Sequence, residues 1–556
     1  SGGTEKPLPN QRGMTTDSAW QASLRGQWQP NAYALLSLGA VGYDGDVVPS
    51  GSMLSLGFEY AQLDIGYRDQ WLSPFTQSAM LLSTNAETMP SVTLSNYAPI
   101  TPLGLTYLVF LAEMDRSDRI RFGDGFTSGN PRLAGLHLAI EPVPGWSLSA
   151  NRIFQFGGGE RGGDSLSDFW RALTNAYEYD NTTAGTRDSE FGNQLAAFTS
   201  RFIFPGPTPF TVYFEYAGED TSYDTDYRLG NASLSAGISF PKLWNTINLT
   251  YEVSEWQNGW YVHGIYRDGL TNGGNIIGHW GADARLPNHG VNARTRMLQI
   301  GWEPPFGGLL QLRGRRIVNG TYSGVLTRGV VYQPGYDITA SYSRSFAGFT
   351  AGVEIMSGDG TFGSDSYHRI AGFVRFGDEW ANGTPSLFRA ERPAGAELFV
   401  DAGINSNRVR ITLDAISVDS GVKTARETAP HFAIGARRAV SKRNDLGARI
   451  EYDSIDGADL WSVRALDYRY RFDSPLAITA FLGASRYSQA TAAFGYYGGV
   501  GLQWRNILPR VDLGVDVRYA DKVQRDKIVP GEAPLRIRPD AFYDISSYSV
   551  YLSYKW

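Results

Sequence analysis

Residues 548–556 read Tyr-Ser-Val-Tyr-Leu-Ser-Tyr-Lys-Trp and end the chain. Apolar and polar positions alternate here with a period of two, which is the spacing of the two faces of an extended strand. One face holds Tyr548, Val550, Leu552, Tyr554 and Trp556, and the other holds Ser549, Tyr551, Ser553 and Lys555. The stretch therefore predicts a β-strand with one apolar face.

The same alternation recurs through the chain. It is clear in residues 511–519, 398–404, 409–413, 310–315, 298–303 and 136–140. Several polar faces carry full charges inside the strand, including Asp512, Asp516 and Arg518. A soluble sandwich or propeller would also alternate, but charges within strands from several parts of the chain favour a barrel with a polar lumen.

Composition supports many short strands. Aromatic residues make up 13% of the 556 residues, and there are 64 Gly and no Cys. Apolar runs fall short of the ~20 residues that a membrane helix needs. The formal net charge of -6 argues against nucleic acid as a partner, since that would require a basic surface.

We therefore predict an all-β protein, a transmembrane antiparallel β-barrel of the bacterial outer membrane. Tryptophans near the predicted strand ends fit interfacial girdles, and the terminal Trp556 resembles the last residue of outer-membrane barrels. We favour one large barrel of about 18–26 strands with loops that occlude its lumen. A separate second barrel would need its own closing strand pair, which the sequence does not reveal.

Long connections separate some of the predicted strands. They cover residues 156–194, 267–291, 357–368 and 521–540. Such loops lie outside the cell in this architecture, so both chain ends are expected in the periplasm. We divide the chain into a periplasmic segment (1–18) and a barrel (19–556), with residues 379–392 breaking the strand rhythm between the parts 19–378 and 392–556.

Several sequence blocks appear in a fixed order. They are Asp69-Gln70-Trp71, residues 81–90 (LLSTNAETMP), residues 146–158 (WSLSANRIFQFGG), residues 165–170 (SLSDFW), Asp180-Asn181, residues 192–196 (GNQLA), residues 216–220 (YAGED) and, more loosely, residues 266–269 (YRDG). Together they resemble the Wzi family of outer-membrane capsule-assembly proteins over roughly residues 60–370. The resemblance implies a closed barrel that acts as a lectin for an anionic or neutral surface polysaccharide. The periplasmic helical segment of that family has no clear counterpart here, and the strands up to Trp556 lie beyond the matched blocks.

Polar and aromatic side chains of the matched region are the candidate polysaccharide-binding residues, because planar amides, charged groups and aromatic faces recognise sugars. They are Arg152, Gln155, Arg161, Asp168, Trp170, Asn193, Gln194, Glu219 and Asp220. Ser165 is expected to cap a short helix through residues 168–173. The alternative role for this helix is to plug the lumen, with Phe169 and Trp170 packed under it.

Catalysis is not expected. Residues 163–166 read GDSL and residues 365–368 read DSYH, as in esterases with a Ser nucleophile, but the surrounding sequence lacks the α/β pattern of those enzymes. The six His show no metal-binding spacing, and we predict neither a metal site nor a cofactor.

Two functions remain open. The first is export or anchoring of capsule or exopolysaccharide, with outer-membrane lipid around the barrel and periplasmic polysaccharide-export proteins as further partners. The alternative is a passive diffusion porin for sugars or ions, which would need an open lumen.

Overall fold

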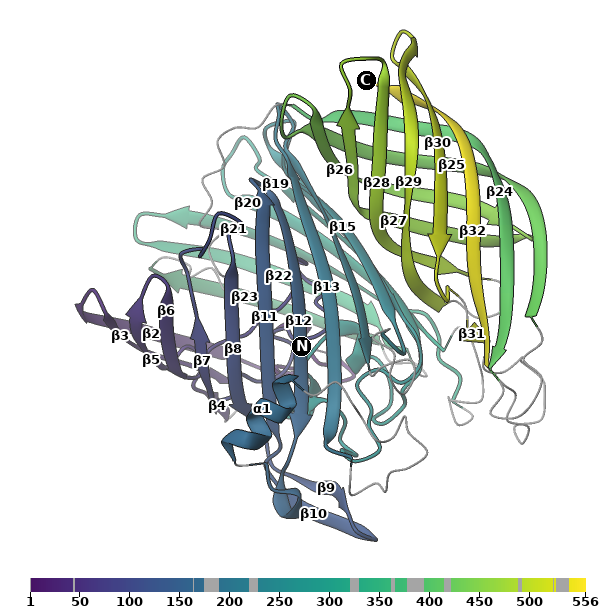
Figure 1. The fold of residues 1–556 in the computed structure, drawn as a ribbon. Helices are drawn as coiled ribbons and strands as arrows, with labels where there is room; N and C mark the ends of the chain where they lie inside the picture. Colours follow the sequence, from purple (N-terminus) through teal and green to yellow (C-terminus); the bar gives the residue numbers. More distant parts are fainter. Residues whose placement is uncertain are drawn as a thin grey trace.

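The computed structural model describes residues 2–43, 46–163, 165–174, 190–219, 229–320, 330–361, 366–377, 395–414, 422–488, 493–523, 525–526 and 540–556. Its strands form two separate large antiparallel sheets, of 19 and 9 strands, with no strand pairing between them among these residues (Figure 1). No helix in the described ranges is long and apolar enough to cross a membrane.

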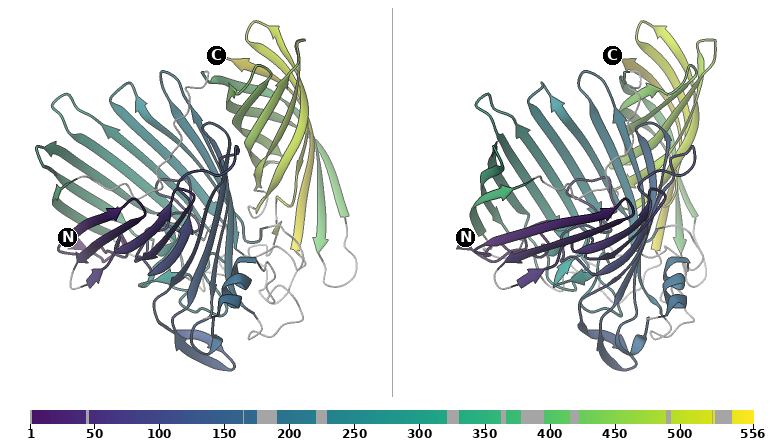
Figure 2. Two further views of the ribbon diagram at one scale, coloured as in Figure 1. Left: turned by 60° about the vertical axis from the view of Figure 1, so that its left-hand side comes forward. Right: turned by 90° about the vertical axis from the view of Figure 1, so that its left-hand side faces the viewer.

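The first sheet is a sequential antiparallel meander that curls around its own interior (Figure 2). Among the described residues its end strands β2 and β23 do not pair with each other, and we call this curled sheet the first barrel. Each long strand pairs with the next in the chain, and β8 pairs with β11 across a small separate hairpin, β9 (Ser117–Phe122) and β10 (Gly125–Gly129). The strands are β1 (Gly2–Gly3), β2 (Gln21–Asn31), β3 (Ala34–Tyr43), β4 (Asp46–Val48), β5 (Met53–Phe58), β6 (Ala61–Gly66), β7 (Ser91–Ser95), β8 (Thr106–Glu113), β11 (Arg132–Val143), β12 (Trp146–Phe156), β13 (Gly192–Phe204), β14 (Phe210–Glu219), β15 (Ser233–Leu243), β16 (Ile247–Trp256), β19 (Ala293–Trp302), β20 (Leu309–Asn319), β21 (Gly335–Phe346), β22 (Phe349–Asp359) and β23 (Ser366–Phe376).

The second sheet closes on itself. Its strands are β24 (Glu397–Asp414), β25 (Val422–Ala439), β26 (Asn444–Ile455), β27 (Ala458–Arg471), β28 (Leu476–Tyr487), β29 (Ala493–Leu508), β30 (Val511–Ala520), β31 (Arg525–Asp526) and β32 (Asp540–Lys555). Because β24 pairs with β32 over sixteen residue pairs, from Phe399↔Lys555 to Asp414↔Asp540, the ring of β24–β30 and β32 is complete. The expectation of one large barrel is therefore wrong: the C-terminal strands pair with each other instead of widening the first sheet.

Outward faces are apolar in both sheets. Leu24, Ile370, Ile404 and Val550 are examples of apolar side chains that remain exposed along the strands. The interior of the second barrel is polar but filled, as is expected of a barrel this narrow. Arg449 contacts Asp401 at 2.7 Å and Asp467 at 3.1 Å, and Arg464 contacts Asp516 at 2.6 Å, all with buried side chains. The charges that indicated a wet lumen thus form a closed network of ion pairs.

The two barrels pack wall against wall. At the end with the short turns, Trp146 and Phe202 of the first barrel lie in one cluster with Ala436 and Leu446 of the second. Midway along the wall, Phe214 contacts Ala448 and Val463. At the opposite end, Arg486 donates to Glu255 at 2.7 Å, so the contact runs the full height of the strands.

A β-bulge shapes this contact. The pairing shifts by one residue around Ala465, which distorts the strand locally and leaves a backbone group without a ladder partner. The Ser200 hydroxyl of the first barrel donates to the Ala465 carbonyl at 3.1 Å, and the Trp146 indole N–H donates to Ser200 at 3.2 Å. The Ala465 carbonyl lies on the outer wall of the second barrel, where lipid could not hydrogen-bond to it, and the first barrel supplies the missing donor.

Candidate functional site: a plugged lumen with a cavity above it

Two inward-folded segments fill the first barrel at one level. They are residues 67–90, between β6 and β7, and residues 257–292, between β16 and β19. Met80, Leu81, Trp260 and Tyr261 from these segments have almost no exposed surface and pack together in one core. That core also includes inward side chains from β8 round to β20, so it reaches across the lumen. We call the two segments together the plug.

Two carboxylates on the barrel wall hold the segment 67–90. Glu252 of β16 accepts hydrogen bonds from the Thr76 N–H at 2.7 Å, the Thr76 hydroxyl at 2.8 Å and the Gln77 N–H at 3.3 Å. Glu215 of β14 accepts from the Ser73 hydroxyl at 2.6 Å. The bonds to the Glu252 carboxylate are charge-assisted and therefore stronger than neutral ones, and together with the Ser73 bond they tie the segment to the wall at two points.

Buried polar groups join the two segments of the plug. The short 3-10 helix η3 (Trp280–Asp283) is capped by His279, whose Nδ1 accepts a hydrogen bond from the Gly281 N–H at 3.0 Å. Burial lowers the pKa of His279 to about 3, so its ring is neutral. Asp283 accepts from the Ile276 N–H at 2.9 Å and from the Asn85 amide at 2.5 Å, and burial raises its pKa to about 6.

The N-terminal segment packs at the same end of the barrel as the long loops. The Thr4 N–H donates to the Ser366 carbonyl at 3.1 Å, and Arg12 forms an ion pair with Asp69. This position is opposite to the short turns and to Trp556, so residues 4–18 do not lie at the end of the barrel where periplasmic chain ends were expected. Periplasmic residence of this segment remains a prediction without support from its place in the fold.

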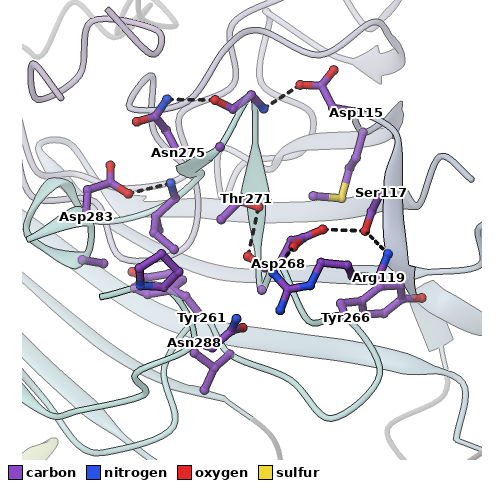
Figure 3. A pocket seen from close by; sticks show the side chains of 18 of the residues that line it. Asp115, Ser117, Arg119, Tyr261, Tyr266, Asp268, Thr271, Asn275, Asp283 and Asn288 are labelled. Atoms are coloured by element: carbon purple, nitrogen blue, oxygen red, sulfur yellow. Dashed lines mark hydrogen bonds and ion pairs between the residues drawn. The ribbon is translucent and has the colours of Figure 1, made fainter. Parts of the chain in front are cut away.

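A cavity of about 590 Å³ lies at the long-loop end of the plug. Its walls come from the chain after β8, from β9, from the end of β12 and from residues 261–288 (Figure 3). Asp268 accepts from the Ser117 hydroxyl at 2.5 Å and from Arg119 at 3.1 Å, while Asp115 accepts from the Gly273 N–H at 2.5 Å. These bonds hold carboxylate and guanidinium groups at the cavity wall.

The cavity is suited to polar recognition. Asp115, Arg116, Arg119, Asn275 and Asn288 bring acceptors and donors to its lining. Carboxylates, guanidinium groups and amides are the side chains that hold sugar hydroxyls. The Tyr261 and Tyr266 rings also contact the cavity but are almost wholly buried, so their faces offer little surface for stacking.

Only Gln155 among the nine sequence-predicted site residues lines this cavity, where its amide donates to the Gly269 carbonyl at 3.4 Å. Asn193 and Glu219 also face the lumen but are buried at the wall, and the charge of Glu219 acts on Arg285. Arg161 donates to the carbonyls of Arg121 and Glu190, which is a structural role. Asp220 lies outside the described residues.

The remaining four predicted residues lie on the outer wall. Helix α1 (Leu166–Thr174) carries Asp168 and Trp170, and it packs against the outward side chains Phe154 and Phe156. Arg152 is on the same face and donates to Gln194 at 2.7 Å. The helix therefore does not plug the lumen, contrary to the alternative considered for it, and the structure does not bring these residues to the cavity.

Ser165 caps α1 as predicted. Its hydroxyl accepts from the Asp168 N–H at 3.1 Å and donates to the Asp168 carboxylate at 2.6 Å. His368, the other member of the esterase-like pattern, contacts the Ser357 hydroxyl at 2.9 Å on the strand pair β22–β23, away from the β11–β12 wall that carries α1. In the described part of the chain, the residues needed for a Ser nucleophile and its base are thus apart.

The cavity residues that sequence reasoning missed lie in two places. Asp268 belongs to the weakest matched block, 266–269, whereas Asp115, Arg116 and Arg119 lie just after β8, in a stretch without a predicted strand or a matched block. The plug segment 67–90 carries two matched blocks but none of the period-two alternation of the neighbouring strands. That interruption was the signal for an inward-folded segment.

Comparisons with known proteins relate part of the chain to one family. Residues 16–292 match the family model described as capsule assembly protein Wzi. The solved structure of Wzi from Escherichia coli, a carbohydrate-binding outer-membrane β-barrel involved in group 1 capsule assembly, aligns with a TM-score of 0.50 at 16% identity, covering 67% of this chain and 80% of that one. The ferric enterobactin receptor of Pseudomonas aeruginosa aligns over 96% of this chain and 81% of its own at 10% identity, with a TM-score of only 0.26. No curated protein sequence matches the chain.

Proposed function

Since the chain belongs, through residues 16–292, to the Wzi family of outer-membrane capsule-assembly proteins, we propose that it anchors bacterial surface polysaccharide by binding it in the cavity at the long-loop end. The observation that carries this proposal is the plug. A polymer held above a filled lumen is retained at the surface, whereas export and passive diffusion both need a continuous path. The filled second barrel offers no such path either.

The chemistry of the cavity supports a hydroxyl-rich ligand. Asp268 accepts from both Ser117 and Arg119, and these two bonds hold its carboxylate at the cavity wall in a position to accept from sugar hydroxyls. Asp115 is likewise fixed by the Gly273 N–H.

The test is binding of exopolysaccharide purified from the host strain to the detergent-solubilised protein, by surface plasmon resonance. Asp268→Asn removes the charge that holds Arg119, and we expect about a tenfold loss of affinity, equivalent to 1.4 kcal/mol. Asp168→Asn on the outer wall is the matched control and should bind like the unmodified protein. Equal binding by all three proteins would exclude this cavity as the site.

Planar-bilayer recording tests anchoring against diffusion and export. The unmodified protein should show no steady conductance, and added exopolysaccharide should not open it. A large steady conductance that the polymer leaves unchanged would favour the porin. Participation of periplasmic polysaccharide-export proteins remains a prediction, and absence of catalysis is likewise part of the proposal.

A further inference from the structure

Helix α1 is capped at its first turn and hydrogen-bonded to the outer wall of the first barrel at its last turn. Ser165 caps its first turn, and Arg152 of β12 donates to the Leu173 carbonyl in its last turn at 3.0 Å. These bonds satisfy backbone groups that a helix terminus leaves open. The helix is therefore a docked element of the wall.

The apolar surface of α1 is wider than the wall can cover. Ala172 is fully buried, and Phe169 and Leu173 pack on the same cluster as Phe154. Leu166 and Trp170 nevertheless remain 71% and 56% exposed. They are four residues apart and lie side by side along one flank of the helix, while Asp168, at 100° per residue, lies on the opposite flank.

The wall beside α1 changes from apolar to polar at this level. Phe198 and Leu138 are exposed on the same outward face, 51% and 42% respectively, nearer the short turns. Arg152 and Gln194 follow on that face and hydrogen-bond to each other. Charged groups are costly in hydrocarbon, so the hydrocarbon contact of this wall ends near Arg152, and α1 lies at that boundary.

We propose that α1 is an interfacial helix, with the flank of Leu166 and Trp170 inserted among the lipids of the leaflet at the long-loop end. Trp is favoured at the level of lipid head groups because its ring is apolar and its N–H is polar. The apolar flank continues the lipid-facing wall sideways, and Asp168, which is half-buried, lies on the flank turned away from that lipid. Trp170 thus binds lipid instead of polysaccharide.

The chain contains no Cys, so single-cysteine variants need no background removal. Trp170→Cys and Asp168→Cys are labelled with a nitroxide and reconstituted in vesicles of phosphatidylcholine and phosphatidylglycerol. Asp168→Cys is a matched control that keeps the helix cap, since Ser165 accepts from the backbone N–H of residue 168. Collisions with oxygen report lipid, and collisions with a water-soluble nickel chelate report water.

We expect the ratio of oxygen to nickel collisions to be several-fold higher at position 170 than at position 168. Leu166→Cys retains Trp170 and should show the same high ratio as Trp170→Cys. Agreement between the two variants would exclude the possibility that loss of the Trp170 ring detached the helix from the wall. High nickel accessibility at both 166 and 170 would overturn the proposal. Protection of both positions from both reagents would also overturn it, because it would indicate a protein contact such as a second copy of the chain.

Discussion

Replacing Glu252 with Gln should release the plug. The carboxylate accepts from three donors of the segment 67–90 and from the Tyr213 hydroxyl at 3.1 Å. In the Glu252→Gln variant the remaining carbonyl oxygen still accepts from Thr76, but the new amide N–H faces the Gln77 N–H. An unsatisfied buried donor costs about 1–3 kcal/mol, and weaker bonds to Thr76 add about 1 kcal/mol.

A total near 3 kcal/mol would raise the population of plug-open molecules by roughly 150-fold. Single-channel recording in planar bilayers measures this as open probability. Glu354→Gln is the matched control, since Glu354 is also a wall carboxylate but pairs with Arg369 of β23, 3.6 Å away. An open probability of Glu252→Gln equal to that of the unmodified protein, with the barrel shown to be intact by heat-shift electrophoresis, would mean that Glu252 does not hold the plug in place.

Three further changes probe other parts of the fold. Burial lowers the pKa of His279 to about 3, whereas an unfolded His titrates at about 6.5. As the pH falls below about 6.5, the unfolded state binds a proton that the folded state does not, so the free energy of unfolding decreases by about 1.4 kcal/mol per pH unit down to about pH 3. Thermal melts of His279→Gln should lack this dependence on pH. Asp467→Asn leaves Arg437 and Arg449 without their shared partner and should lower the unfolding free energy of the second barrel by about 3–5 kcal/mol in urea titration; an unchanged midpoint would contradict the role of the network. Ser200→Ala leaves the Ala465 carbonyl at the bulge without its hydrogen-bond donor and should weaken the contact between the barrels by about 1–3 kcal/mol. In a thermal melt, the unfolding transitions of the two barrels should then lie further apart in temperature than in the unmodified protein.

Strands were predictable because alternation is local. The period-two segment 511–519 became β30, and residues 398–404 and 409–413 proved to be parts of one long strand, β24. Closure is not local: the pairing of β24 with β32 joins residues more than a hundred positions apart, and nothing in either strand distinguishes a narrow ring from a wide one. The number of barrels therefore required the structure.

The candidate site was predictable only in part for a related reason. Period two distinguishes the two faces of a strand but does not state which face is inside. Gln155 and Arg152 lie three positions apart, and that odd spacing places the first at the cavity and the second on the outer wall. The sequence block that suggested one binding surface in fact spans both sides of the barrel wall.

Each of the two barrels ends on an exposed aromatic side chain at the short-turn end: Phe376 in the last strand of the first and Trp556 just after the last strand of the second. The next strand begins at Glu397 at that same end, where Arg438 beside the second barrel's turn bonds to the Pro144 carbonyl of the first. The chain can pass from one barrel to the other without recrossing the bilayer. Biogenesis can accordingly proceed as two successive insertions from the same side of the membrane.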